Sequence, residues 1–79
     1  MTHKFIAPGQ ILFRDYVQPS GLSIAAVAKS LHIPCSRLRA VLGGKAAVTA
    51  DLALRLERLF GSEAKAWLDL QSAYDLRMA

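Results

Sequence analysis

The sequence predicts an all-α fold of five helices and no strand. The first observation is the spacing of apolar residues, which recur every three or four positions, as on one face of a helix. The second is composition, because 53% of the 79 residues are hydrophobic, which suits a single compact domain over residues 1–79 and excludes a disordered chain. The third is that proline, glycine and capping residues separate the apolar runs at intervals typical of short helices.

The first helix is expected to begin near Pro8, because the N–H that proline lacks would be unpaired at an early helical position. Pro19 and Gly21 are expected to end it. Ser23 is a typical N-cap for the second helix. The apolar positions expected to face the core from that helix are Ile24, Val27, Ala28 and Leu31.

The remaining helices follow the same logic. After a His32-Ile33 turn, Pro34 is expected to open the third helix, and a Gly43-Gly44 pair to end it. Thr49 is the expected N-cap of the fourth helix. Its expected buried stripe is Leu52, Ala53, Leu56, Leu59 and Phe60. The fifth helix is expected to follow Gly61 and to start at Ser62 and Glu63.

The segment from Leu22 to Lys45 has the spacing of a helix-turn-helix. Ala28 supplies a small side chain where the second helix is crossed, and Leu38 supplies the apolar residue that faces back from the third. The net charge of the chain is +4, and the stretch from Tyr16 to Ala50 contains no Asp or Glu. An acid-free segment centred on a helix-turn-helix predicts a surface that faces phosphates. The expected DNA contacts are Cys35, Ser36, Arg37, Arg39, Ala40, Gly44, Lys45 and Thr49.

The two arginines of the third helix are expected to have different roles. They lie two residues apart, so they point about 200° apart around a helix. One can read guanine while the other holds a phosphate, whereas the alternative is two solvated arginines. Ser36 and Ala40 lie one turn apart and are expected to face the groove.

The fifth helix is apolar on more than one side. A helix that covers a single core needs one apolar stripe, so the surplus suggests a second copy of the chain. The alternative is that both faces pack within a monomer. The residues expected at the dimer interface are Ala66, Trp67, Leu70, Ala73 and Tyr74.

Other functions find no support in the residues. The chain has one cysteine, Cys35, which excludes an internal disulfide and suits a reducing cytoplasm. Two His and one Cys are too few for a metal site, and no catalytic set is recognisable, so neither an enzyme nor a cofactor is expected. No apolar run is long enough for a membrane span, and the N-terminus lacks the core of a signal peptide.

Several blocks of residues resemble one family. PGQILFRDYVQPSGLS, LGGKAAVTADLALRL, LFGSEAKAWLDLQ and YDL follow in order between residues 8 and 76. In this order they are similar to the HigA/VapI-type antitoxins, a branch of the Xre/Cro-repressor helix-turn-helix family. The resemblance implies a five-helix lambda-repressor-like domain in a cytoplasmic homodimer that binds double-stranded DNA at a palindromic operator in its own promoter. It also implies that the protein neutralises a RelE-like ribonuclease toxin.

Three positions depart from the family pattern. Ile24 replaces a glutamine that touches a phosphate, His32 stands where the turn usually has glycine, and Pro34 stands where the third helix usually has a Ser or Thr cap. Two alternatives therefore remain, a stand-alone repressor without a toxin and a protein-interaction module with a decayed DNA surface. Toxin neutralisation, if present, is expected to use the folded surface or the first ~7 residues, which precede the structured part of the chain.

Overall fold

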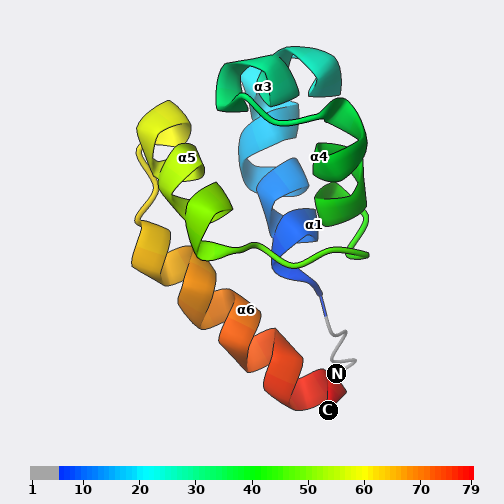
Figure 1. The fold of residues 1–79 in the computed structure, drawn as a ribbon, viewed down its shortest axis with the longest axis vertical. Helices are drawn as coiled ribbons and strands as arrows, with labels where there is room; N and C mark the ends of the chain where they lie inside the picture. The colour runs from blue at the N-terminus through cyan, green and yellow to red at the C-terminus, as the bar shows by residue number, and fades with distance from the viewer. Residues whose placement is uncertain (1–5) are drawn as a thin grey trace.

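The structure is a computed structural model and describes residues 6–79. Its helices form five continuous segments, which confirms the predicted all-α fold with five helices (Figure 1). The first segment runs in series through α1 (Pro8–Leu12), the π-helical turn η1 (Phe13–Val17) and α2 (Gln18–Ser20). The others are α3 (Ile24–Leu31), α4 (Cys35–Leu42), α5 (Ala50–Phe60) and α6 (Ala64–Met78).

The end of the first segment differs from the prediction. Pro19 does not end it, because Pro19 lies inside α2 and the helix continues to Ser20. A proline ring in an α-helix collides with the carbonyl four residues earlier, and the wider π-helical turn immediately before α2 changes that spacing. The predicted stop at Gly21 is confirmed, since this residue adopts a left-handed φ of 75°.

The predicted caps of two helices are confirmed. The Ser23 hydroxyl accepts a hydrogen bond from the Ala26 N–H at 3.1 Å, and Thr49 Oγ1 accepts one from the Leu52 N–H at 3.2 Å. Pro34 differs slightly from its prediction, because it occupies the N-cap position and α4 begins one residue later. Proline offers no capping side chain, but its carbonyl accepts the N–H groups of the first turn of α4.

The turn between α3 and α4 has a left-handed residue. His32 has a φ of 59°, the one positive value among the described residues other than glycine. An L-residue pays a steric cost in this region, although histidine visits it more often than β-branched residues do. The backbone therefore turns sharply here in the way that the family glycine would allow, and it places α4 across α3.

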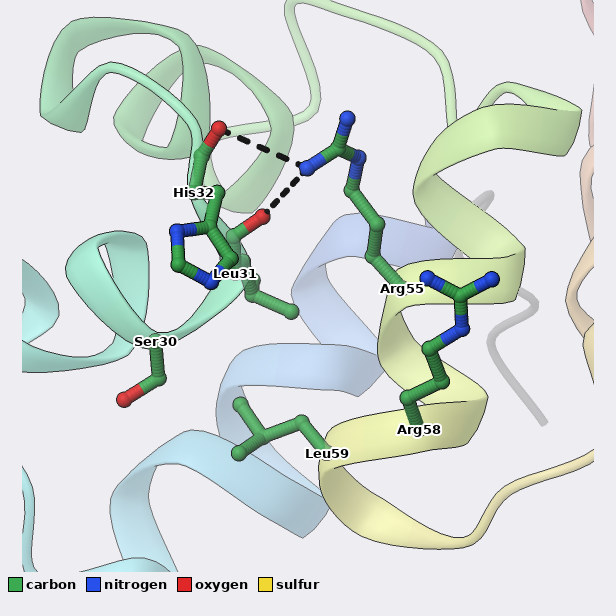
Figure 2. Close-up of a pocket in the computed structure, with 6 residues that line it drawn as sticks. All are labelled: Ser30, Leu31, His32, Arg55, Arg58 and Leu59. Atoms are coloured by element: carbon green, nitrogen blue, oxygen red, sulfur yellow. Dashed lines mark hydrogen bonds between the residues drawn. The ribbon is translucent and has the colours of Figure 1, made fainter.

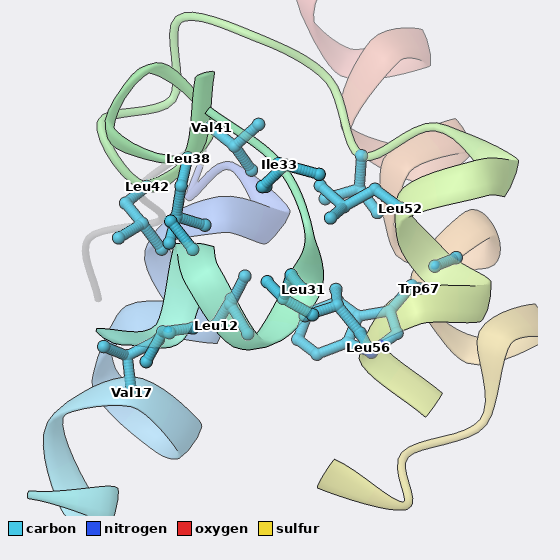
Figure 3. Packing of buried hydrophobic residues seen from close by; sticks show 14 residues of the cluster. Leu12, Val17, Leu31, Ile33, Leu38, Val41, Leu42, Leu52, Leu56 and Trp67 are labelled. Atoms are coloured by element: carbon cyan, nitrogen blue, oxygen red, sulfur yellow. The ribbon is translucent and has the colours of Figure 1, made fainter. Parts of the chain in front are cut away.

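The core lies where α4 packs on α1 and α3 packs on α5, with α6 against α1 and α5 (Figure 3). Ala28 and Leu38 are buried, as their spacing predicts. At the crossing of α1 and α4, a Cβ on Gly9 would overlap the Val41 carbonyl, so this crossing needs a glycine. The fully buried side chains that hold the elements together include Leu12, Val17, Val27, Leu31, Leu38, Val41, Val48, Leu52 and Leu56.

The long helix α6 closes the core from one side and extends beyond the body (Figure 1). Trp67 is buried, and its ring centroid lies 5.5 Å from that of Tyr16, which also packs on Phe60 at 5.5 Å. Leu59 and Phe60 are half-buried at the edge of the core, so the buried stripe of α5 is narrower than predicted. None of the helices in residues 6–79 is long and apolar enough to cross a membrane.

Candidate nucleic-acid interface

The exposed side of α4 carries the residues that the sequence assigns to DNA. Leu38, Val41 and Leu42 are buried on one side of the helix. On the other side Ser36, Arg37 and Arg39 are exposed, while Cys35 and Ala40 are half-buried. Because α4 is anchored by three apolar side chains, this face has a fixed orientation, as a helix that enters a DNA groove requires.

Arg37 is connected to the start of α5. Its Nη2 donates to Thr49 Oγ1 at 3.4 Å, and the same hydroxyl oxygen caps α5. Two residues that are twelve positions apart in the chain therefore lie together at one rim of the face. Because α4 is helical through both residues, Arg39 leaves the helix about 200° around its axis from Arg37.

The loop over residues 43–49 continues this face from the end of α4. The N–H groups of Lys45 and Ala46 donate to the Ala40 carbonyl at 2.8 and 3.2 Å, so the backbone turns back on the helix. Gly44 allows this turn with a φ of 78°, and a Cβ there would lie 3.2 Å from the Ala7 Cβ. The Lys45 side chain is exposed. The structure thus brings Gly44, Lys45 and Thr49 next to α4.

The positive charge of this face is not neutralised by neighbouring acids. The ion pairs found in residues 6–79 are Arg14–Asp15, Arg55–Asp51 and Lys65–Asp69, and none involves Arg37, Arg39 or Lys45. Hydrogen bonding to Arg14 lowers the pKa of Asp15, and the bond to Asp69 raises the pKa of Lys65, but both pairs lie outside α4 and its loop. Unpaired cations on a fixed helix suit the phosphates of a duplex.

Arg55 fixes the turn in front of α4. Its Nη1 donates to the Leu31 carbonyl at 2.8 Å and to the His32 carbonyl at 3.5 Å (Figure 2). Its Nε pairs with Asp51 Oδ2 at 2.9 Å. The sequence leaves Arg55 either solvated or paired with Glu57 or another acid, with a phosphate contact as a further option, and the structure pairs it with Asp51. Glu57 instead accepts the N–H of Ala64 at 2.9 Å. The guanidinium borders an open hollow of about 270 Å³ lined by Ser30, Leu31, His32, Arg55, Arg58 and Leu59.

The expected dimer residues fall on two different sides of α6. Ala66, Leu70 and Ala73 are exposed and share one stripe, and Tyr74 is half-buried. Trp67 does not belong with the expected dimer residues, because its side chain is 3% exposed and lies in the core of its own chain. Its Nε1 donates to Ser62 Oγ at 2.8 Å, so its polar edge is satisfied internally as well.

Comparison with known proteins identifies the fold. No protein-family profile matches the chain. Virulence-associated protein I of Dichelobacter nodosus is 50% identical over 74 residues, which are 94% of this chain and 68% of that protein. A solved addiction module antidote protein of the HigA family from Coxiella burnetii is 43% identical with a TM-score of 0.89, covering 98% of this chain and 84% of the other.

The chain belongs to the HigA/VapI-type antitoxin family. A second solved member of the HigA family is the Pseudomonas aeruginosa antitoxin HigA with the higBA promoter. It is 32% identical, with a TM-score of 0.90, and the match covers 95% of this chain and 82% of that one. The chain spans about two thirds of the length of the curated relatives that it matches.

The sequence analysis does not predict that two residues, Arg55 and Gln71, hold the backbone on either side of α4. Arg55 belongs to the ALRL block and Gln71 to the WLDLQ block, so both stand in the motifs that carry the family resemblance. Their partners are backbone groups of the turn before α4 and of the loop after it. A hydrogen bond to a backbone group does not depend on the residue type of the partner, so the partner segments show no pattern that predicts it. The family motifs that contain Arg55 and Gln71 are the one signal in the sequence that could have indicated these bonds.

Proposed function

We propose that the protein is the antitoxin of a toxin–antitoxin pair, a homodimer that binds a palindromic operator in its own promoter and represses transcription. The observation that carries the proposal is the fixed basic face of α4, with Ser36, Arg37 and Arg39 exposed beside Lys45 and Thr49. Its relative from Pseudomonas aeruginosa was solved with the higBA promoter, which supports DNA as the ligand of this face. The role is binding in the cytoplasm by a single domain, without catalysis or a cofactor.

Within this proposal the face divides into two kinds of contact. Ser36, Arg39 and Ala40 enter the major groove, where Arg39 can hold guanine through its two-pronged guanidinium and the Ala40 methyl can touch thymine. Arg37 is held at the rim by Thr49, which suits a phosphate contact. Cys35, Gly44, Lys45 and Thr49 line the DNA backbone on either side. The Gly44 N–H already donates to the Val41 carbonyl at 3.0 Å, so Gly44 contributes close approach to a phosphate and not a hydrogen bond.

The dimer is proposed to form through α6. Its exposed stripe contains Ala66, Leu70 and Ala73, and Leu70 is 40% exposed despite its apolar side chain. Pairing this stripe with its copy would bury that surface and present two α4 helices to one face of the duplex. The helices would then enter successive major grooves about 34 Å apart.

The experiment that tests the DNA function is fluorescence anisotropy on the DNA upstream of the gene. The proposal predicts tighter binding to this DNA than to a scrambled duplex and a steep loss of affinity with salt. Arg37→Ala and Arg39→Ala should each weaken binding at least about tenfold. Arg14→Ala removes the same charge from η1 and should leave affinity nearly unchanged. Equal, weak binding to both duplexes would favour the alternative of a protein-interaction module.

One departure from the family pattern gives that alternative some support. Ile24 is half-buried against the core, so the phosphate contact of the usual glutamine is replaced by packing at this position. Charge reversal at Arg37 and Arg39 separates the two functions. Loss of operator binding would support the DNA face, and unchanged binding would exclude it.

The proposed toxin is a RelE-like ribonuclease encoded beside this gene. A surface of the folded domain is one possible contact; residues 1–5, within the expected N-terminal contact, lie outside the described residues. Co-expression with the neighbouring gene, followed by purification and a messenger-RNA cleavage assay, tests this part. A stable complex without cleavage supports the antitoxin, whereas operator binding without any such neighbour supports the stand-alone repressor.

A further inference from the structure

Gln71 stands out among the buried residues of α6. It is 9% exposed, and it is the one buried side chain among the described residues that is polar. Its Oε1 accepts a hydrogen bond from the Val48 N–H at 2.8 Å, and its Nε2 donates to Asp75 Oδ1 at 2.8 Å. A polar side chain is costly to bury unless both ends are paired, and here both ends are paired.

The bond to Val48 crosses from α6 to the loop beside α4. Val48 is 2% exposed, so its N–H has no access to water and needs a partner within the protein. The start of the loop is tied to α4 through the Ala40 carbonyl, and its end is tied to α5 through the Thr49 cap. Gln71 holds the loop between these two points, from the side opposite the solvent.

Asp75 fixes the orientation of the Gln71 amide. The Val48 N–H can only donate, and an ionised Asp75 carboxylate can only accept. One of the two orientations of the amide satisfies both partners, and a flipped amide would satisfy neither. The pair Gln71–Asp75, four residues apart on α6, therefore presents an oxygen to the loop in a defined position.

We propose that Gln71 is a positioning residue for operator binding, which sets the place of the Lys45 and Thr49 phosphate contacts relative to α4. This inference rests on the proposed DNA function. It assigns two sides of α6 two different tasks, since Gln71 faces the loop and the stripe with Leu70 faces solvent. It also gives one shared task to a residue of the WLDLQ block and a residue of the YDL block, because Gln71 and Asp75 are hydrogen-bonded.

The first test measures the bond itself. Gln71→Met keeps the length of the side chain and removes both hydrogen bonds, and Asp75→Ala removes the orienting group at an exposed position. Gln18→Met, on the exposed side of α2, is the matched control. Amide hydrogen exchange followed by NMR should show faster exchange of Val48 in Gln71→Met, a smaller increase in Asp75→Ala and none in the control. Unchanged exchange of Val48 in both variants would overturn the proposal.

The second test measures operator binding of the same full-length proteins, at a temperature where circular dichroism shows each to be folded. Gln71→Met should bind the upstream DNA about tenfold more weakly, and its salt slope should fall by about one unit, as for the loss of a lysine–phosphate contact. Asp75→Ala should lose less affinity. Should Gln71→Met fail to fold, Asp75→Ala carries the test alone.

A double-mutant cycle separates positioning from general destabilisation. In a Lys45→Ala background, Gln71→Met should cost less further affinity than in the wild type, because one of the two contacts that Gln71 positions is already absent. In an Arg39→Ala background, Gln71→Met should weaken operator binding by the same factor as in the wild type. Equal losses in both backgrounds, or wild-type affinity in Gln71→Met, would overturn the positioning role while the DNA function stands. Failure of the wild type to prefer its upstream DNA would instead overturn the proposed function and this inference with it.

Discussion

The two ends of the core, α4 and α6, bury similar apolar anchors but expose opposite chemistries. α4 buries Leu38 and Val41 and exposes serine and two arginines, whereas α6 buries Trp67 and exposes Leu70 with two alanines. A charged face stays hydrated until a partner of opposite charge replaces the water. An exposed apolar stripe is stabilised when any apolar surface packs on it and removes it from water. Under the proposed function, α4 meets the polar ligand and α6 meets a protein surface.

The largest effect is expected where α4 rests on α1. Gly9→Ala should destabilise the protein by about 3 kcal/mol, because a Cβ would overlap the Val41 carbonyl and force the helices apart. Urea denaturation followed by circular dichroism measures it. Gly43→Ala is the control, since its Cβ would meet no atom closer than 3.4 Å, and it should change stability by no more than about 0.5 kcal/mol. Equal effects would mean that the crossing does not fix α4.

The next effect concerns the apolar stripe of α6. Leu70→Asp should raise the dimer dissociation constant by about tenfold or more without unfolding the chain, because a carboxylate would be buried at the contact. Sedimentation equilibrium measures the association. Leu54→Asp is matched to it, since Leu54 is 52% exposed on α5 and lies outside the stripe. A monomeric wild type, or equal loss in both variants, would contradict the assignment of α6 to the dimer.

A finer effect tests the division of labour on α4. Arg39→Lys keeps the charge but loses the two-pronged geometry, so it should weaken operator binding about tenfold and change binding to scrambled DNA little. Arg37→Lys should weaken both by a similar small factor, because a lysine still reaches a phosphate. Anisotropy on the two duplexes gives the ratios. The reverse pattern would assign the base contact to Arg37.

The smallest effect concerns the support of the turn before α4. Arg55→Lys should cost about 1 kcal/mol of stability, because an ammonium cannot reach Asp51 and the Leu31 carbonyl with the same geometry. Thermal unfolding of the variant, compared with Arg58→Lys on the same helix, measures this. If Arg55→Lys were as stable as Arg58→Lys, the bonds in Figure 2 would contribute nothing to the placement of the turn.

The sequence predicts the elements well because their signals are local. Ser23 and Thr49 mark helix starts, because each hydroxyl accepts a hydrogen bond from the backbone N–H three residues later. Gly21 marks a helix end, because glycine readily adopts the left-handed φ that ends a helix. The prediction that Pro19 ends the first helix is wrong because the effect of a proline depends on the turn before it, and a π-helical turn leaves no recognisable pattern in the sequence.

In the candidate site, too, the features with local signals follow from the sequence and those that depend on the packed fold do not. The exposed side of α4 follows from the position of Leu38, because one inward residue fixes the direction of its neighbours on a helix. Trp67 could not be placed in the core from spacing alone, because α6 is apolar on both sides. The bonds of Arg55 and Gln71 join segments that are 23 or 24 residues apart, and such pairing depends on the packed fold.

In the proposed complex, two copies of α4 bind successive major grooves of the upstream DNA. Hydroxyl-radical footprinting of that DNA with the wild-type protein tests it most directly. Two protected windows centred about 10 base pairs apart on one face of the duplex are expected. Both windows should disappear with charge reversal at Arg37 and Arg39. Absent protection at concentrations where the protein is a folded dimer, or protection that survives the charge reversal, would contradict it.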